Sequence, residues 1–254
     1  MAALPPVIEI ANLSYSVNGR MILDGIDLTI TEGEIFAVMG LSGTGKTTLL
    51  RLMTGLIRPD SGSIRVLGKE ITTMTETELN VMRGATGLVF QYGALFDSLT
   101  VRDNVGFRLY ESTNESELTI RRVVAEKLAL VGMTGTEELY PAELSGGMQK
   151  RIGVARALVS DPRILLYDEP TSGLDPVIAA TIDDLILHLR ATLGVTEVIV
   201  SHAVSSVMKM AHHVALLYNG HVQLVGAPEV FRTSQDPVVR QFLEGRTDGP
   251  IQVI

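Results

Sequence analysis

The sequence contains no cysteine among its 254 residues. Disulfides and thiolate metal sites are therefore excluded, which agrees with a reducing compartment. Long apolar runs are also missing, because glycine or charge interrupts each run well before the roughly 20 residues that a membrane-spanning helix needs. The segment Met1–Leu13 lacks the basic start and apolar stretch of a secretion signal. We expect a chain that is soluble by itself and resides in the cytoplasm.

Basic residues are fewer than acidic ones, 21 against 29, which gives a formal net charge of −8. Such a chain lacks the positive field that neutralises nucleic-acid phosphates, so we expect no nucleic-acid partner. The 46% of hydrophobic residues are enough for a substantial core. We therefore expect one large domain over residues 1–254.

The hydrophobic pattern predicts an α/β protein. Residues 7–30 alternate between apolar and polar positions around Asn18-Gly19, which predicts an antiparallel hairpin. The apolar run 34–39 predicts a buried strand before a glycine-rich turn and a helix over 47–55. Strand, helix and strand in this order predict a parallel core with right-handed crossovers. Other predicted segments are strands at 86–90, 163–167 and 195–200, helices within 75–157 and after Pro176 up to Gly194, and a second hairpin at 213–225.

Residues 40–47, Gly-Leu-Ser-Gly-Thr-Gly-Lys-Thr, fit the phosphate-binding loop pattern between a strand and a helix. Glycines let backbone N–H groups turn toward phosphates, and the helix N-terminus adds the positive end of its dipole. Lys46 would reach the β and γ phosphates, and Thr47 would bind Mg²⁺. The alternative is an ordinary glycine-rich turn with an exposed lysine.

Asp168 and Glu169 follow the predicted strand 163–167. The carboxyl end of such a strand is where α/β sheets bind ligands. Asp168 suits the Mg²⁺ sphere, and Glu169 suits a general base for the attacking water. Alone, an acidic pair there is more often a helix cap or a solvated edge, but the phosphate loop favours the functional interpretation.

Residues 144–148, Leu-Ser-Gly-Gly-Met, precede a helix and indicate which class of phosphate-loop protein this chain resembles. At this point the chain resembles the ABC transporter ATPases along essentially its whole length. The resemblance implies a RecA-like parallel core, an N-terminal antiparallel β subdomain, a helical subdomain at about 92–157 and a C-terminal tail at about 240–254. It also implies a homodimer that sandwiches two ATP molecules, in which Ser145, Gly146 and Gly147 contact the nucleotide of the partner subunit. Taken alone, Ser145 could be a simple N-cap.

The resemblance implies further roles. Gln91 would touch Mg²⁺ and the attacking water, His202 would be the switch histidine, and Asp175 lies in the loop that crosses the dimer interface. The aromatic residue that usually stacks on adenine falls at Val17, with Tyr15 two residues earlier on the same strand face, so base selectivity is expected to be weak. The implied set comprises the catalytic residues Glu169, His202, Gln91 and Lys46; the metal ligands Thr47, Gln91 and Asp168; and the nucleotide contacts Gly40, Ser42, Gly43, Thr44, Gly45, Lys46, Thr47, Thr48, Tyr15, Val17, Ser145, Gly146, Gly147 and Asp175.

Three local features resemble the ATPases of Mla/Mce-type phospholipid transporters: Met148, the run 91–96 and the tail from Arg240. That resemblance implies an integral membrane permease, a lipid-binding Mce-domain component and a peripheral position on the cytoplasmic face of the inner membrane. Residues 92–101 and 105–107 would form part of the permease groove, or else pack internally. The alternatives are a small-solute importer ATPase, a non-transport ABC ATPase acting on DNA or ribosomes, and a nucleotide-binding module without hydrolysis.

Overall fold

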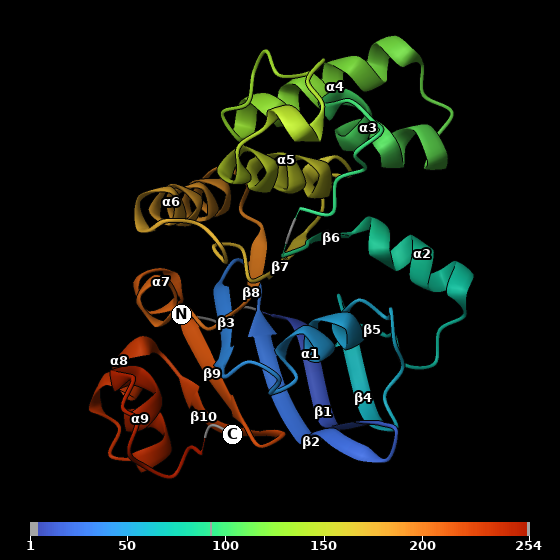
Figure 1. Cartoon of the computed structure of the whole chain (residues 1–254). Coiled ribbons are helices and arrows are strands. Elements are labelled where there is room, and N and C mark those ends of the chain that lie inside the picture. Colours follow the sequence, from blue (N-terminus) through green and yellow to red (C-terminus); the bar gives the residue numbers. More distant parts are fainter. Residues whose placement is uncertain (1–4, 92, 253–254) are drawn as a thin grey trace. The chain divides into compact units, whose positions relative to one another are not determined.

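The computed structural model describes residues 5–91 and 93–252, and the chain divides into two compact units. Unit 1 contains the chain up to Leu79 and from Val198 onward, and unit 2 contains Asn80–Glu197. Figure 1 shows both units, coloured along the sequence. Helix α2 and strand β8 each run through a boundary. Among the described residues, none of the helices has the length and apolarity that crossing a bilayer requires.

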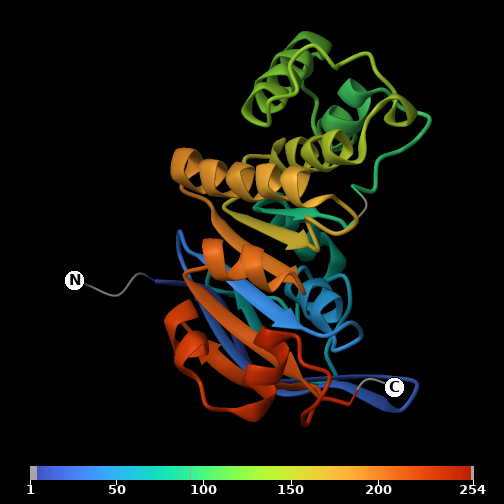
Figure 2. The same ribbon diagram turned by 60° about the vertical axis from the view of Figure 1, so that its left-hand side comes forward.

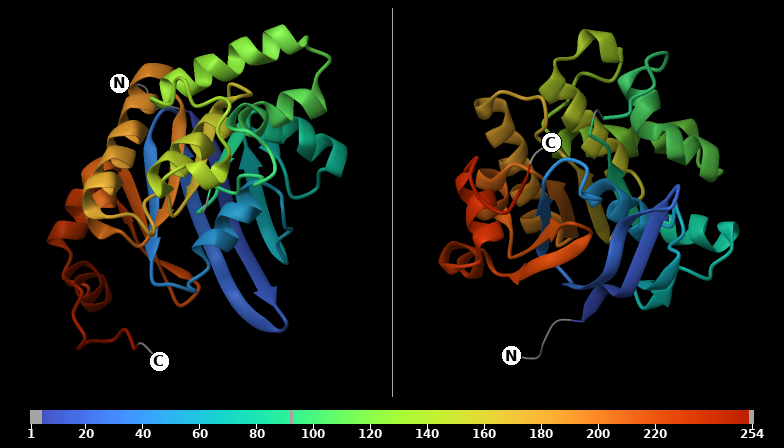
Figure 3. Two further views of the ribbon diagram at one scale, coloured as in Figure 1. Left: turned by 45° about the horizontal axis from the view of Figure 1, so that its top comes forward. Right: turned by 60° about the horizontal axis from the view of Figure 1, so that its bottom comes forward.

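An antiparallel sheet in unit 1 is built around a long hairpin, which Figure 3 shows in blue. Asn18 and Gly19 join its strands at φ values of 51° and 77°, as the predicted Asn-Gly turn requires. The side of the sheet with Ile8, Ile10 and Leu28 is buried. The strand order is β2-β1-β4-β5, with β1 Pro6–Val17, β2 Arg20–Thr31, β4 Ser61–Val66 and β5 Lys69–Glu70. The sequence had not indicated β4 and β5.

The second sheet of unit 1 carries the phosphate loop. Its strand β3, Ile35–Gly40, is buried at every residue and pairs in parallel with β9, His213–Tyr218. The predicted second hairpin is confirmed, because β10, His221–Gly226, pairs antiparallel with β9. The order here is β10-β9-β3-β8, with β8 Thr196–Ser201. The helices of this unit are α1 Lys46–Met53, α7 Val204–Met210, α8 Pro228–Thr233 and α9 Pro237–Glu244.

Unit 2 contains two parallel strands and most of the helices. Strand β6, Thr86–Val89, pairs with β7, Ile164–Asp168. Helices α3, α4 and α5 pack against one another, as Figures 1 and 2 show in green and yellow. Helix α6 begins at Pro176 after the N-cap Asp175 and ends at Leu193, and its C-cap is Gly194, where the sequence predicts the helix to stop. The helices are α2 Glu76–Gly84, α3 Val101–Ser112, α4 Glu117–Leu130, η1 Pro141–Glu143, α5 Gly146–Leu158 and α6 Pro176–Leu193.

The fold class expected from the sequence is confirmed: an α/β chain with parallel strand pairs, an antiparallel β region and a group of helices. The subdomain bounds stay predictions. Helices α3, α4 and α5 span Val101–Leu158 and lie almost wholly within the predicted helical region 92–157. Tyr92, where that region was expected to begin, lies outside the described residues, as do positions 253 and 254 of the predicted tail.

Candidate active site

The phosphate loop of unit 1 is shaped by its own backbone. Gly40 has a φ of 155°, and a Cβ there would lie 2.6 Å from the Leu217 carbonyl oxygen and 2.7 Å from Thr44 Oγ1. Only glycine fits this close approach. Thr44 Oγ1 donates to the Leu41 carbonyl at 2.9 Å, and Gly45 takes the left-handed N-cap position of α1. These contacts fix the shape of the loop at the N-terminus of α1.

Lys46 is the buried cation of this loop, with only 7% of its surface exposed. Its Nζ donates to the carbonyl oxygens of Gly40 at 2.9 Å and Leu41 at 3.0 Å. The lysine therefore lies back along the loop, and the alternative of an exposed lysine is wrong. A small cavity of about 200 Å³ beside it is lined by Ile22, Gly43, Gly45, Lys46, Thr47 and Thr48. Helix N-terminal N–H groups and one ammonium beside a cavity are the chemistry that binds phosphate.

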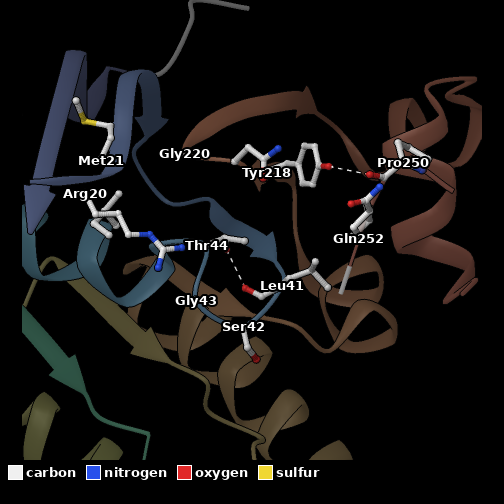
Figure 4. Close-up of a pocket in the computed structure, with 13 residues that line it drawn as sticks. Arg20, Met21, Leu41, Ser42, Gly43, Thr44, Tyr218, Gly220, Pro250 and Gln252 are labelled. Carbon is white, nitrogen blue, oxygen red and sulfur yellow. Dashed lines mark hydrogen bonds between the residues drawn. The ribbon is translucent and has the colours of Figure 1, made fainter. Parts of the chain in front are cut away.

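A larger cavity of about 890 Å³ adjoins the same loop, and Figure 4 shows its lining. On one side are Arg20 and Met21 of the hairpin, and on another Tyr218 and the chain end around Pro250. Tyr218 Oη donates to the Pro250 carbonyl at 3.2 Å. Tyr15 and Val17, the predicted adenine contacts, do not line this cavity, although Val17 is 44% exposed on β1. Their adenine role stays a prediction.

The described part of the tail folds onto unit 1 beside the phosphate loop. The side-chain amide of Gln241 accepts from the Ile251 N–H at 2.7 Å and donates to the Ile251 carbonyl at 3.1 Å. Ile251 joins the buried cluster with Met39 and Phe231. A cavity of about 300 Å³ is lined by Ser42, His202 and residues of this tail. His202, which is exposed after β8, thus lines the same cavity as Ser42 of the loop, and its role as the switch histidine stays a prediction.

In unit 2 the predicted base Glu169 lies in a tight turn after β7. Its φ of 48° is in the left-handed region, where a non-glycine residue is uncommon. Glu169 is 8% exposed, and its carbonyl accepts from the Ser172 N–H at 3.1 Å. Gln91 Nε2 donates to Ser172 Oγ at 3.2 Å. The Glu169 turn and the Gln91 loop, which sequence analysis had assigned to one site, are therefore in contact through Ser172.

Lys150 of α5 joins the same two segments, and the sequence had not indicated it. Its buried Nζ donates to the Gln91 carbonyl and, at 3.3 Å, to the Glu169 carbonyl. Burial lowers the pKa of Lys150, and the negative charges of Glu169 and Asp168 oppose that shift. Because both bonds are to backbone carbonyls far along the chain, no local sequence signal marks this contact.

The segment 144–148 precedes α5, as predicted. Ser145 Oγ accepts from the Met148 N–H at 3.3 Å, so Ser145 is the N-cap of this helix. Gly146 and Gly147 form its first turn, and a Cβ on Gly147 would lie 2.6 Å from Ile178. Asp175 caps α6 through bonds of 3.0 Å to the N–H groups of Val177 and Ile178. Both caps satisfy helix N–H groups within the chain, and the contacts of Ser145 and Asp175 with nucleotide stay predictions.

Comparison with known proteins decides the family. The family described as ABC transporter matches residues 23–172, more than half of the chain. The chain belongs to the ABC transporter family. It is 45% identical over 244 residues to the probable ribonucleotide transport ATP-binding protein mkl of Mycobacterium tuberculosis, covering 96% of this chain and 68% of that protein. It is 40% identical over 245 residues to the intermembrane phospholipid transport system ATP-binding protein MlaF of Escherichia coli, covering 96% and 91%.

Solved ABC structures share the fold. The dimeric ATP-binding cassette MJ0796, in a post-hydrolysis state with ADP and Pi, superimposes with a TM-score of 0.79 at 29% identity, covering 87% of this chain and 98% of that one. The chain is thus an ATPase of the ABC type. Residues 144–148, called the signature segment below, and the signature helix α5, which begins at Gly146, lie in unit 2. The phosphate loop lies in unit 1.

The residues expected for nucleotide and Mg²⁺ thus fall into two groups. Gly40 to Thr48 and His202 belong to unit 1, whereas Gln91, Asp168, Glu169 and the signature segment belong to unit 2. In unit 1 the cradle of glycines, Lys46 and the half-buried Thr47 fits a phosphate with its metal ion. In unit 2 the oxygen donors of Asp168 and Gln91 are of the type that Mg²⁺ prefers. Beyond the expected residues, the structure adds Lys150, Ser172 and the cavity residues Arg20 and Tyr218.

Proposed function

We propose that this chain hydrolyses ATP to power phospholipid transport between membranes through a separate membrane permease. The observation that carries the ATPase mechanism is the placement of two side chains. Lys46 is hydrogen-bonded to the carbonyl groups of its own loop, and Glu169 lies in a turn at a φ of 48°. The lipid substrate is supported by the similarity to MlaF, which extends over 91% of that protein.

In the proposed mechanism the α1 N-terminus and Lys46 bind the β and γ phosphates of ATP. Lys46 exchanges its bonds to the Gly40 and Leu41 carbonyls for phosphate oxygens, so little rearrangement of the loop is required. Thr47, Asp168 and Gln91 would hold Mg²⁺, which supplies positive charge next to the phosphates. Glu169 accepts the proton of the attacking water, and His202 stabilises the γ-phosphate end.

We propose that two copies of the chain form a dimer around two ATP molecules. Ser145, Gly146 and Gly147 would then contact the γ-phosphate of the ATP on the partner subunit, as helix N-termini contact anions. The MJ0796 cassette, whose fold matches 87% of this chain, is dimeric. Because closure of the proposed dimer requires the γ-phosphate of ATP, hydrolysis opens the dimer and provides the switch for transport.

The permease contact is proposed at aromatic side chains of unit 2. Phe90, Phe96 and Phe107 are 36–41% exposed, and the rings of Phe96 and Phe107 lie 4.8 Å apart. Arg156 covers the Phe96 ring at 4.8 Å. For Val101 and Val105 the sequence left open a place in the groove or internal packing, and both are fully buried and pack internally. The proposed location is the cytoplasmic face of the inner membrane, in a complex that includes a lipid-binding Mce-domain component.

A second candidate is the energising of small-solute import. It is favoured by the 45% identity to mkl, which is named for probable ribonucleotide transport. The two candidates share the ATPase mechanism and differ only in subunits other than this one. Their separation therefore requires the assembled complex.

The test is to purify the intact membrane complex through a tag on this chain and to identify its bound small molecules by mass spectrometry. Consistent recovery of phospholipid above the level in a tagged, unrelated ABC complex supports lipid transport. Recovery of nucleotides or other polar solutes without phospholipid enrichment would overturn the lipid assignment and favour the importer. The ATPase part is tested separately by the Glu169 substitution described below.

A further inference from the structure

The amine of Lys150 joins three parts of unit 2 that act in ATP hydrolysis. It belongs to the first half of α5, four residues after Gly146, where the signature helix begins. Its two carbonyl partners are in the Gln91 loop and in the turn of the proposed base Glu169. Lys150 is 5% exposed, so water does not compete strongly for these bonds.

The bond to the Glu169 carbonyl bears directly on the direction of the catalytic side chain. With a φ of 48°, Glu169 adopts a conformation that costs a non-glycine residue energy and persists only when its surroundings hold it. Two donors hold its carbonyl, the Ser172 N–H at 3.1 Å and Lys150 Nζ at 3.3 Å. The backbone dihedrals of a residue set where its Cβ points, so holding this peptide group aims the carboxylate.

The second bond fixes the Gln91 loop to the same ammonium. Gln91 is also tied to the Glu169 turn by its own side chain, through Ser172. The Gln91 loop and the Glu169 turn therefore share two links, one through Lys150 and one through Ser172. Of these, only the Lys150 link continues into the signature helix.

We propose that Lys150 is a positioning residue for ATP hydrolysis, which holds Glu169 and the Gln91 loop in register with the signature helix α5. The inference rests on the proposed function, because it requires Glu169 to be the base. It also gives a physical link between the two nucleotide sites of a dimer. Nucleotide of the partner subunit, bound at the N-terminus of α5, would act through Lys150 on the base of this subunit.

The test uses the full-length chain with Lys150→Met, which keeps the length of the buried stem and removes all donors. Arg151→Met is the matched control, since Arg151 is the next residue of α5 and donates to the Val131 carbonyl at 2.9 Å and the Thr181 carbonyl at 3.4 Å, away from the base. We expect Lys150→Met to lower kcat about 10- to 100-fold, as misplacement of a base does, with little change in KM for ATP. Arg151→Met should lower kcat less than about threefold at a temperature where both variants are folded.

A double-mutant cycle with Glu169→Gln separates positioning from general weakening of the fold. If Lys150 acts through Glu169, Lys150→Met should cause little further loss in the Glu169→Gln background, measured as single-turnover hydrolysis. Equal further losses in both backgrounds, or matching kcat losses in the Lys150 and Arg151 variants, would overturn the proposal. If Lys150→Met does not fold, Lys150→Arg, which keeps a donor, takes its place. We expect Lys150→Arg to retain more than half of the wild-type kcat. A fall in kcat as large as that of Glu169→Gln would count against positioning. The proposed function fails by a different result, namely full activity of Glu169→Gln alone.

Discussion

The two compact units each hold a buried lysine against backbone carbonyls, but they do so over different lengths of chain. In unit 1, Lys46 donates to Gly40 and Leu41, six and five residues away. In unit 2, Lys150 donates to Glu169 and Gln91, 19 and 59 residues away. The bonds of Lys46 lie within one short motif, whereas the bonds of Lys150 form only when distant segments of the chain have packed together. In the proposed mechanism, changes at Lys46 affect ATP binding, whereas changes at Lys150 and Glu169 affect the chemical step.

The largest effect is expected for Glu169→Gln. Removal of a general base costs about 10²–10⁴ in rate, and the amide keeps the shape of a side chain that is only 8% exposed. Turnover should fall by that factor while the affinity for ATP stays within about threefold of wild type. Steady-state hydrolysis and equilibrium nucleotide binding on the same preparation measure both. Unchanged turnover would show that the base is another residue.

A second buried glutamate of unit 2, Glu197, provides a contrast with the proposed base Glu169. Glu197 is fully buried, and burial raises its pKa to about 8, although Tyr167 Oη donates to it at 3.0 Å. Because the pKa of Glu197 in the folded chain exceeds its ordinary value of 4.5, its contribution to stability is fully present below about pH 4.5 and is lost as pH rises from there through 8. Glu197→Gln removes this dependence without touching the base.

The measurement is urea unfolding of wild type and Glu197→Gln between pH 5 and pH 9. One unit of pKa corresponds to about 1.4 kcal/mol, so wild type should lose on the order of 2–4 kcal/mol relative to the variant over this range. Turnover at pH 6 should be the same in both chains. Parallel stability curves of the two chains would contradict the burial argument.

In unit 1, Lys46→Met should weaken ATP binding. Hydrogen bonds to charged groups contribute about 1.5–3 kcal/mol, which corresponds to roughly 10- to 100-fold in affinity. Methionine keeps much of the buried stem of Lys46, so the fold should persist. Titration with ATP and with adenosine distinguishes the phosphate contribution, because adenosine affinity should not change. An equal loss for both ligands would mean that the loop itself had been disrupted.

The smallest effect is expected for Gln241→Ala in the tail. This change removes both side-chain bonds to Ile251 and leaves its buried N–H without that partner, which costs about 1–3 kcal/mol. Limited proteolysis should release the chain end near Gly249 before other sites. Arg240→Ala is the matched control, since Arg240 is half-exposed and pairs with Glu244 on the surface. Equal protection of the two variants would show that Gln241 does not hold the tail.

Sequence reasoning recovered the local features of both units. The hairpins at Asn18-Gly19 and Asn219-Gly220, the strand before the phosphate loop and the stop of α6 at Gly194 are encoded by short patterns, and all are confirmed. Strands β4 and β5 were missed because their turn is Leu67-Gly68, and leucine at a φ of 50° carries no turn signal. The register of β4 depends on the distant strand β1, with Ile8 opposite Val66, and β5 pairs only with β4 among the described strands.

The sequence indicates candidate site residues but not the hydrogen bonds that connect them. The motifs indicated Lys46, Glu169 and Gln91, because each follows a strand in a recognisable context. The sequence did not show that Lys46 lies back on its own loop, that Ser172 bridges Gln91 to the Glu169 turn, or that Lys150 is shared between them. The Lys150 contact depends on the packing of α5 against β6 in unit 2, which no short pattern specifies.

The measurement that tests the account most directly is the mass of Glu169→Gln in solution with ATP and with ADP. In the proposed dimer the phosphate loop of one subunit faces the segment 144–148 of the partner subunit, with the γ-phosphate between them. We predict twice the chain mass of 27.4 kDa with ATP and Mg²⁺, and the single-chain mass with ADP, by analytical ultracentrifugation. The single-chain mass with ATP bound, at concentrations far above the nucleotide Kd, would contradict the account.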